Sequence, residues 1–170
     1  MALRSRQKLD AEKSLEVLLY VAKRMPVFYR TLKIIYFADK CHLASHGRLM
    51  YGESYRAMES GPVPSLAYDI IKQVQGTGRV QVEGATEAFH MDDFRIVPMR
   101  EPDLDLLSES ERECLDAIIA ECGTMSGGEL KVRSHDAAYK AVPRNKMMPL
   151  EVIAGDLPDA DVLLDYLENG

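Results

Sequence analysis

Apolar residues recur along the chain at the intervals expected for helices. Near the start they stand at Leu15, Leu18, Leu19 and Ala22. Asp10 is a favourable capping residue, so a first helix is predicted from Asp10 to about Met25. The next segment, from about Tyr29 to His46, is apolar on more than one face and is followed by Gly47. Because a helix that is apolar on several faces is usually the most buried one, this segment is the predicted centre of the fold.

The middle of the chain is predicted to contain a connection, a helix and a small sheet. Residues 48–63 lack helical periodicity and are expected to form an irregular or partly extended segment packed over the central helix. Pro64 suits the first turn of a third helix, which ends near Gln75. The alternation in residues 79–82 and the segment 88–99, with a turn at Asp92-Asp93, then predict short antiparallel strands.

The last third of the chain carries signals for further helices. Ser108-x-x-Glu111 is a capping box ahead of a helix that ends at Gly123, and Ser126-x-x-Glu129 repeats the pattern. Later helices are expected to start at Ser134-His135-Asp136, at Pro149 and at Pro158. The pattern as a whole predicts an α+β fold, mostly α-helical: one compact domain over residues 1–170, with about six to eight helices and a small antiparallel sheet inserted in the middle.

Composition and charge narrow the class of protein. Of the 170 residues 46% are apolar, yet no apolar run reaches the roughly 18 residues of a membrane span, and no apolar segment follows the basic start as in a secretory signal. The three cysteines are few and widely spaced, which indicates reduced thiols and a cytoplasmic location. They are Cys41, Cys114 and Cys122.

The charge is unevenly distributed along the chain. The net charge is −6, with +5 in residues 1–60 and −11 in residues 61–170. We expect the two halves to face each other in the fold, because opposite charges then pair. A net acidic chain is a poor ligand for nucleic acid, since affinity there comes mostly from cations. The acidic half also suits a basic protein partner.

One polar stripe stands out on the central helix. Asp39, His42 and His46 follow one another at intervals of three and four residues, so they share one helical face. Such a set can hold a divalent metal, but a zinc protease needs a glutamate beside its first histidine, and Lys40 and Leu43 stand there instead. The favoured interpretation is that Asp39 and His42 are buried and hydrogen-bond to the connection packed above them. No metal or other cofactor is therefore expected.

The sequence contains no recognisable catalytic motif. It lacks the G-x-S-x-G nucleophile elbow, and Gly127-Gly128 lacks the strand and the Lys-Ser/Thr that make a phosphate-binding loop. Cys41 and His42 are adjacent in a helix and so point in different directions, while Cys114 and Cys122 fit a core pattern. We therefore expect the protein not to be an enzyme.

The alternative function is a winged-helix-like, DNA-binding transcriptional regulator, because helices with a small hairpin can form such a domain. A recognition helix should present several polar or basic side chains on one face. The third helix offers Lys72, Gln73 and Gln75, and the short helix after Ser126 offers Lys131 and Arg133. These are few for a DNA-binding surface.

A longer run of residues resembles the SocA-like Panacea domain. The run is Leu32-Lys33-Ile34-Ile35-Tyr36-Phe37-Ala38-Asp39-Lys40-Cys41-His42-Leu43, then Gly47-Arg48, Tyr55-Arg56-Ala57-Met58 and Gly61-Pro62-Val63-Pro64. Ser134-His135-Asp136-Ala137-Ala138-Tyr139 is similar to a later element of the family, with Tyr139 in place of the usual tryptophan. Gly127-Gly128 also departs from the bulkier residues often found there. The resemblance extends from the first helix to the final one.

The resemblance implies that the protein is an antitoxin. Members of this family neutralise a cognate toxin, encoded nearby, by direct protein–protein contact, and one branch instead hands the toxin to an AAA+ protease. No membrane partner is expected, because no apolar run is long enough to span a membrane. The resemblance and the stripe together mark nine candidate residues for the family motif or for partner binding: Tyr36, Asp39, His42, Tyr55, Met58, Glu59, Gly61, Pro62 and His135. Gly61-Pro62 is expected to form a fixed turn that presents Met58, Glu59 and Ser60.

Overall fold

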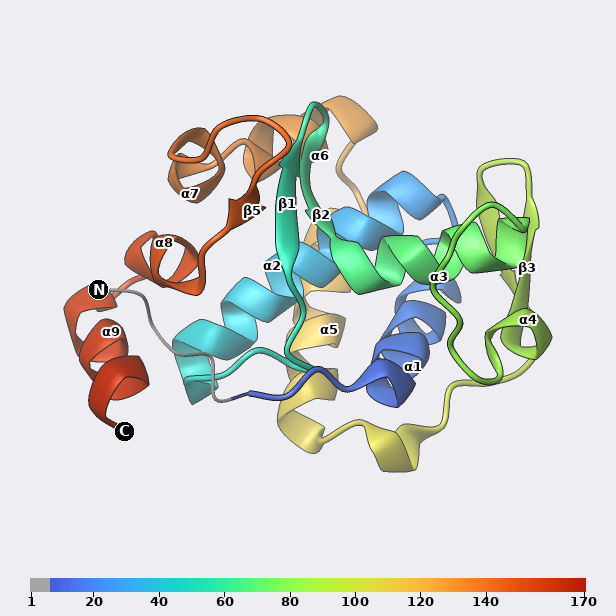
Figure 1. The fold of residues 1–170 in the computed structure, drawn as a ribbon, viewed down its shortest axis with the longest axis horizontal. Helices are drawn as coiled ribbons and strands as arrows, with labels where there is room; N and C mark the ends of the chain where they lie inside the picture. The colour runs from blue at the N-terminus through green and yellow to red at the C-terminus, as the bar shows by residue number, and fades with distance from the viewer. Residues whose placement is uncertain (1–6) are drawn as a thin grey trace.

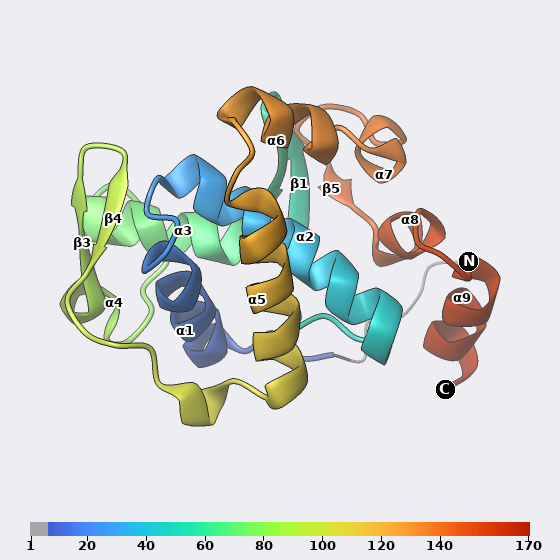
Figure 2. The same cartoon turned by 180° about the vertical axis from the view of Figure 1, so that it is seen from behind.

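The longest helix, α2 (Phe28–His46), runs through the middle of the computed structural model, which describes residues 7–170 (Figures 1 and 2). Every residue from Thr31 to Asp39 is buried, because helices or strands pack around α2 on all sides. Gly47 ends the helix in the left-handed conformation, with φ of 73°. The prediction of a central, mostly apolar helix is confirmed.

The described residues form nine α-helices and one short 3₁₀ helix around this centre. Besides α2, the bounds are α1 (Ala11–Ala22), α3 (Ser65–Gln75), α4 (Ala85–Ala88), η1 (Leu104–Leu106), α5 (Glu109–Cys122), α6 (Gly127–Ser134), α7 (Ala137–Lys140), α8 (Leu150–Gly155) and α9 (Ala160–Asn169). The first helix is shorter than predicted and ends at Ala22 instead of Met25. The α+β class is confirmed, although the helices outnumber the predicted six to eight. None of the described helices is long and apolar enough to cross a membrane.

Two small antiparallel sheets lie apart in the fold, one along α2 and one at its N-terminal end. One contains β1 (Tyr55–Met58), β2 (Gly61–Pro64) and β5 (Met147–Met148) in the order β2-β1-β5. The other is the hairpin of β3 (Phe89–Asp92) and β4 (Arg95–Pro98), at the far end of the molecule from α9 (Figure 1). The β1–β2 hairpin packs along α2. The sequence predicts only an irregular or partly extended connection there. Pro62 and Pro64 conceal β2, because proline fits a sheet only at an edge strand. In the structure β2 is an edge strand and is buried at all four positions.

Two details of the predicted sheet are wrong. Residues 79–82 form no strand, because the side chain of Gln73 replaces a strand partner: it accepts from the Val82 N–H at 2.8 Å and donates to the Val82 carbonyl at 3.1 Å. The hairpin turns at residues 93–94, one position later than predicted, with Asp93 in the left-handed region at φ of 55°.

A single cluster of buried apolar side chains contains residues from Leu15 to Leu163. It includes the predicted core positions of α1, which are Leu15, Leu18, Leu19 and Ala22. The capping signals of the sequence are also confirmed: Asp10 accepts from the Lys13 N–H, and Ser108 and Glu111 form the reciprocal capping box of α5. This frame fixes α2, and with it the candidate residues that α2 carries.

Candidate functional site

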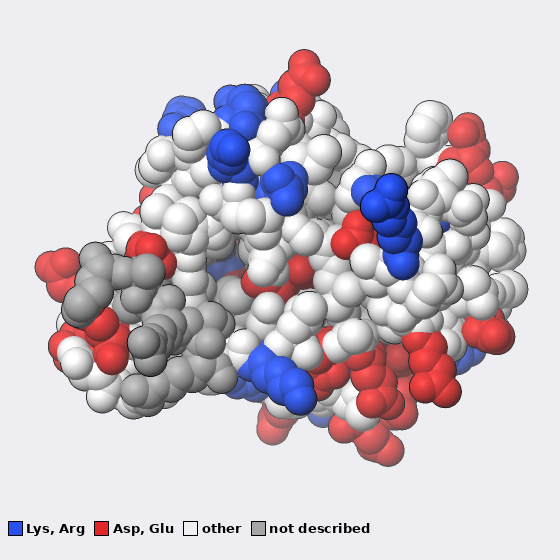
Figure 3. All heavy atoms as spheres, viewed as in Figure 1, with Lys and Arg blue, Asp and Glu red and all other residues white. Residues whose placement is uncertain are grey.

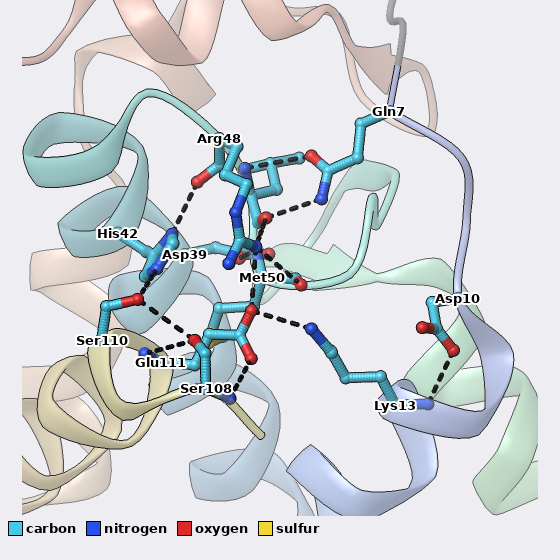
Figure 4. Close-up of polar contacts among 11 residues, drawn as sticks. Gln7, Asp10, Lys13, Asp39, His42, Arg48, Met50, Ser108, Ser110 and Glu111 are labelled. Carbon is cyan, nitrogen blue, oxygen red and sulfur yellow. Dashed lines mark hydrogen bonds and ion pairs between the residues drawn. The ribbon is translucent and has the colours of Figure 1, made fainter. Parts of the chain in front are cut away.

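The carboxylate of Asp39 ties α2 to the segment that follows it. Asp39 is 1% exposed. Its Oδ1 atom accepts a hydrogen bond from the Met50 N–H at 2.7 Å (Figure 4). Its Oδ2 atom accepts one from the Tyr55 hydroxyl at 2.6 Å. The predicted hydrogen bonding of Asp39 to the connection over residues 48–63 is therefore confirmed, through Met50 and Tyr55.

A second buried carboxylate, Glu53, lies in the same segment. Its oxygens accept from the N–H groups of Leu66 and Ala67, at 3.0 and 3.2 Å, and from the Tyr51 hydroxyl at 2.7 Å. These N–H groups belong to the first turn of α3, so Glu53 satisfies donors that the helix itself leaves free. Burial raises the pKa of Asp39 to about 7 and also raises the pKa of Glu53.

His42 is held through both ring nitrogens. Nδ1 lies 2.9 Å from the Arg48 carbonyl and Nε2 lies 2.9 Å from the Ser110 hydroxyl (Figure 4). Because a carbonyl only accepts, Nδ1 carries the proton and Nε2 accepts from Ser110. Burial lowers the pKa of His42, which favours this neutral form. His46 is exposed and its ring lies 4.7 Å from that of His42, but within residues 7–170 no three His, Cys, Asp or Glu side chains are grouped to hold a metal ion.

Glu111 joins three segments beside His42. Its carboxylate is buried and forms ion pairs with Lys13 of α1 at 2.9 Å and with Arg48 at 2.8 Å (Figure 4). It also accepts from the Ser108 N–H at 2.8 Å. Burial alone would raise the pKa of Glu111, but these hydrogen bonds outweigh it, so the pKa is lowered and the group is charged. Asp39, His42 and Glu111 thus form a structural polar network in which the carboxylates and the imidazole are already hydrogen-bonded.

The tip of the β1–β2 hairpin differs from its prediction. The turn falls at Glu59 and Ser60, which are exposed, whereas Gly61 and Pro62 are buried within β2. The expectation of a Gly61-Pro62 turn is therefore wrong. Gly61 instead has φ of 117°, and a Cβ atom there would lie 2.5 Å from Ser134 Oγ, so glycine lets β2 pack against α6.

Lys33 of α2 contacts the backbone of the β1–β2 hairpin. Its ammonium is buried, donates to the Pro62 carbonyl at 2.7 Å and lies 5.2 Å from the centre of the Tyr29 ring. Burial lowers the pKa of Lys33 to about 7. Sequence reasoning placed Lys33 in the family motif but missed this role, because its carbonyl partner lies 29 positions away in a strand that was not predicted.

The segment after α6 is fastened to α2 and to the hairpin. Asp136 accepts from the Tyr36 hydroxyl at 2.8 Å and from Lys40 at 2.8 Å. The Tyr139 hydroxyl donates to the Met58 carbonyl, and the His135 ring lies 4.4 Å from the Tyr139 ring. Family motif residues that are about 100 positions apart therefore meet in one place.

Burial separates the nine candidate residues into two groups. Six are buried and hold the fold: Tyr36, Asp39, His42, Tyr55, Gly61 and Pro62. Met58 and His135 are partly exposed, and Glu59 is exposed at the hairpin tip. Partner binding by these three remains a prediction, and it is confined to one end of the molecule.

Beside the hairpin tip lies a surface that sequence reasoning missed. Figure 3 shows Lys and Arg side chains gathered over α7, the following loop and β1, and Asp and Glu side chains along the opposite lower edge. We call the first surface the basic face and define it by its exposed residues: Arg56, Lys140, Arg144 and Lys146. The sequence hides it because Arg56 lies far from the other three and because residues 61–170 have a net charge of −11.

The basic face is fixed by the fold. Arg56 donates to the Asn145 carbonyl at 2.6 Å, and the Arg144 guanidinium lies 4.2 Å from the centre of the Tyr139 ring. Backbone hydrogen bonds tie the loop to β1: the Asn145 N–H donates to the Ala57 carbonyl at 2.7 Å, and the Ala57 N–H donates to the Lys146 carbonyl at 2.9 Å. Both arginines are therefore positioned before any partner binds.

Five of the described basic residues of the first 60 positions form ion pairs with carboxylates from the later part of the chain. Lys13 and Arg48 pair with Glu111, Lys40 pairs with Asp136 and Asp156, and Lys23 and Arg24 pair with later carboxylates. The prediction that the two oppositely charged halves face each other is confirmed.

Three of the residues offered for DNA recognition contact other groups of the fold. Gln73 is buried against Val82, and Arg133 pairs with Glu121 at 2.8 Å. Lys72 lies 4.4 Å from the centre of the Tyr68 ring.

Most of the chain also matches a known protein family. Residues 32–139 match the family described as "Antitoxin SocA-like, Panacea domain", a span from α2 to α7 that covers more than half of the chain. The span contains all nine candidate residues, but it is shorter than the resemblance expected from the sequence, which reached the first and last helices. No curated protein and no solved structure matches the chain.

Proposed function

Because the chain belongs to the SocA-like Panacea family of antitoxin domains, we propose that it is the antitoxin of a toxin–antitoxin pair and neutralises a protein toxin by direct contact. The family match over residues 32–139 carries this proposal. The toxin is the product of an open reading frame next to the gene for this chain.

The hairpin tip and the basic face together form the proposed docking surface. A stable protein interface takes about 800 Å² from each partner. The chain exposes 8900 Å² in total, so an interface of this size occupies about a tenth of the surface and is larger than the tip alone. The tip contributes Glu59, and the basic face contributes its four cations. Met147, which follows Lys146 in the chain, is 40% exposed and adds an apolar side chain.

Preorganisation of this surface favours binding by direct contact. Side chains that are already ordered lose less conformational entropy when a partner arrives. The ring contact of Arg144 and the hydrogen bond of Arg56 provide this order on the basic face. Lys33 and Tyr139 provide it at the hairpin, because both donate to carbonyls of the hairpin strands.

A growth assay tests the proposal. The neighbouring reading frame is expressed alone and then together with this protein. We expect arrest of growth in the first case and rescue in the second. A harmless neighbour, or a toxic neighbour that is not rescued, would contradict the proposal.

The same strain separates two fates of the bound toxin. If the antitoxin only sequesters the toxin, the toxin level measured by immunoblot stays constant after protein synthesis is stopped. If the antitoxin delivers the toxin to an AAA+ protease, the toxin level falls, and it stops falling when the protease gene is deleted. Direct contact is required in both cases and is measured by co-purification from the protease-deficient strain.

A further inference from the structure

Two cysteines from facing helices bring their sulfur atoms together. Cys41 lies in α2 and Cys114 in α5, and their Sγ atoms are 3.0 Å apart although 73 positions separate them in the chain. Both are free thiols. A disulfide has an S–S length of about 2.05 Å, so the sulfurs need to approach by only about 1 Å to be joined. Among the described elements, α2 and α5 make the most extensive contact, which keeps the two thiols opposite each other.

The two thiols differ in their access to solvent. Cys41 is partly exposed and lines a pocket of about 280 Å³, together with Phe37, Ala44 and Ile118. Cys114 is 5% exposed and does not line this pocket. The pocket has room for a small molecule such as hydrogen peroxide, since a water molecule occupies about 30 Å³. An oxidant that enters it meets the sulfur of Cys41 first.

The pocket also contains hydrogen-bond donors. Lys40 and Arg133 are among its lining residues. Their N–H groups can donate to an oxygen that leaves with negative charge. Lys40 is held in place by Asp136 and Asp156, and Arg133 by Glu121.

We propose that Cys41 and Cys114 form a reversible, peroxide-sensitive dithiol site, in which peroxide oxidises Cys41 and Cys114 closes the disulfide. Nothing in the proposed antitoxin function requires this site, and it stands on the geometry of α2 and α5 alone. Disulfides of reduced compartments are usually of this transient, redox-sensing kind.

The chemistry takes two steps. In the first, the Cys41 thiol gives up its proton and its sulfur attacks one oxygen of hydrogen peroxide; the O–O bond breaks, and the released hydroxide takes up a proton to become water. This leaves a sulfenic acid on Cys41. In the second, the Cys114 sulfur attacks the Cys41 sulfur, the S–O bond breaks, and the oxygen leaves as water with the Cys114 proton. Two thiols lose two electrons in all, and one peroxide is reduced to two waters.

The order of the steps agrees with the surroundings of Cys114. Burial, together with the neighbouring Cys41 thiol, raises the pKa of Cys114 to about 12. Cys114 therefore stays protonated at neutral pH and reacts poorly with peroxide, since the thiolate is the nucleophile. It becomes reactive only toward a sulfur in direct contact, as in the second step.

Mass spectrometry of the full chain tests the proposal. After the reductant is removed, the protein is treated with about one equivalent of hydrogen peroxide. We expect a loss of about 2 Da, a peptide map that links Cys41 to Cys114, and recovery of the thiols with dithiothreitol. The melting temperature should rise by roughly 5–15 °C on oxidation, because the bond closes a long loop.

Three variants identify the roles. Cys122→Ser should behave like the wild type, because Cys122 lies apart from the pair. Cys114→Ser should stop at a sulfenic acid on Cys41 that dimedone captures, and Cys41→Ser should form neither product. The proposal would be overturned by a bond to Cys122, by a dimer linked between chains, by sulfinic acid without any disulfide, or by dimedone capture in Cys41→Ser.

Discussion

Asp39 and Lys33 are buried ionisable residues of the same helix, and each is satisfied by groups outside that helix. Asp39 accepts from the Met50 N–H and the Tyr55 hydroxyl. Lys33 donates to the Pro62 carbonyl. The family resemblance marked both positions in the sequence. The sequence does not show which atoms bond to Asp39, because hydrogen bonds between distant segments leave no periodic signal.

Removal of the Asp39 carboxylate should destabilise the fold. Asp39→Ala leaves the Met50 N–H and the Tyr55 hydroxyl without their acceptor, so the free energy of unfolding should fall by about 1–3 kcal/mol. Chemical denaturation measures this change. Asp39→Asn is the matched control, because its carbonyl oxygen can still accept from the Met50 N–H and its NH2 group can donate to the Tyr55 hydroxyl oxygen. An Asp39→Ala protein as stable as the wild type would show that the network does not hold the fold.

The difference in stability between the wild type and Asp39→Asn should depend on pH. The pKa of Asp39 is about 7 in the folded chain against an ordinary value of 3.8, so the folded state holds this proton more tightly. The contribution of Asp39 to stability therefore decreases as the pH rises from about 4 to 7, by up to about 1.4 kcal/mol per pH unit. Asp39→Asn lacks this dependence, so its stability relative to the wild type should improve between pH 5 and pH 7. A difference that stays constant over this range would contradict the shifted pKa.

Lys33 should show the opposite dependence on pH. Its pKa is about 7 when folded against an ordinary 10.5, so below pH 7 the fold contains a buried charge, and this penalty disappears as the pH rises toward 10.5. Lys33→Met fills a similar volume without the charge. We expect this variant to be more stable than the wild type at pH 7 and the gain to shrink at pH 9, measured by urea unfolding. A variant that is less stable at pH 7 would show that the hydrogen bond to Pro62 outweighs the buried charge.

At the scale of elements, the sequence predicts features whose signals are local. The Asp10 cap, the Gly47 terminus and the Ser108-x-x-Glu111 box were all correct, because each depends on residues within one helical turn. The β1–β2–β5 sheet was missed, since β5 lies about 90 positions after β1 and two prolines obscure β2. Residues 79–82 were wrongly predicted as a strand because the partner of Val82 is a side chain, that of Gln73.

Replacement of Gly61 by a larger residue should destabilise the packing of β2 on α6. Gly61→Ala places a Cβ atom at φ of 117° and 2.5 Å from Ser134 Oγ, so β2 must shift away from α6. Backbone strain of this kind costs about 1–3 kcal/mol, before any loss of packing. Gly127→Ala is the control, because Gly127 has no atom within 4 Å of the added group. Thermal unfolding should show a clear loss for Gly61→Ala and almost none for Gly127→Ala; equal melting temperatures would contradict the close packing of the hairpin on α6.

At the scale of the whole molecule, charge is organised by the fold and only partly by the sequence. Pairs such as Lys13–Glu111 and Lys40–Asp136 neutralise much of the positive first third, as the charge pattern predicted. The basic face arises instead in the acidic part of the chain, where folding places Lys140, Arg144 and Lys146 beside Arg56. The net charge of this part of the chain therefore does not predict the basic face, which is the surface that suits an acidic partner.

Binding of purified toxin, measured by isothermal titration calorimetry, tests the central claim most directly. The double variant Arg144→Glu/Lys146→Glu reverses two charges of the basic face, and Arg79→Glu/Arg95→Glu is the matched control with two exposed arginines elsewhere. We predict that the wild type and the control bind alike, whereas the basic-face variant binds at least about tenfold more weakly, a loss of about 1.4 kcal/mol. Absence of binding by the wild type would contradict direct neutralisation. Equal binding by all three proteins would contradict docking through the basic face.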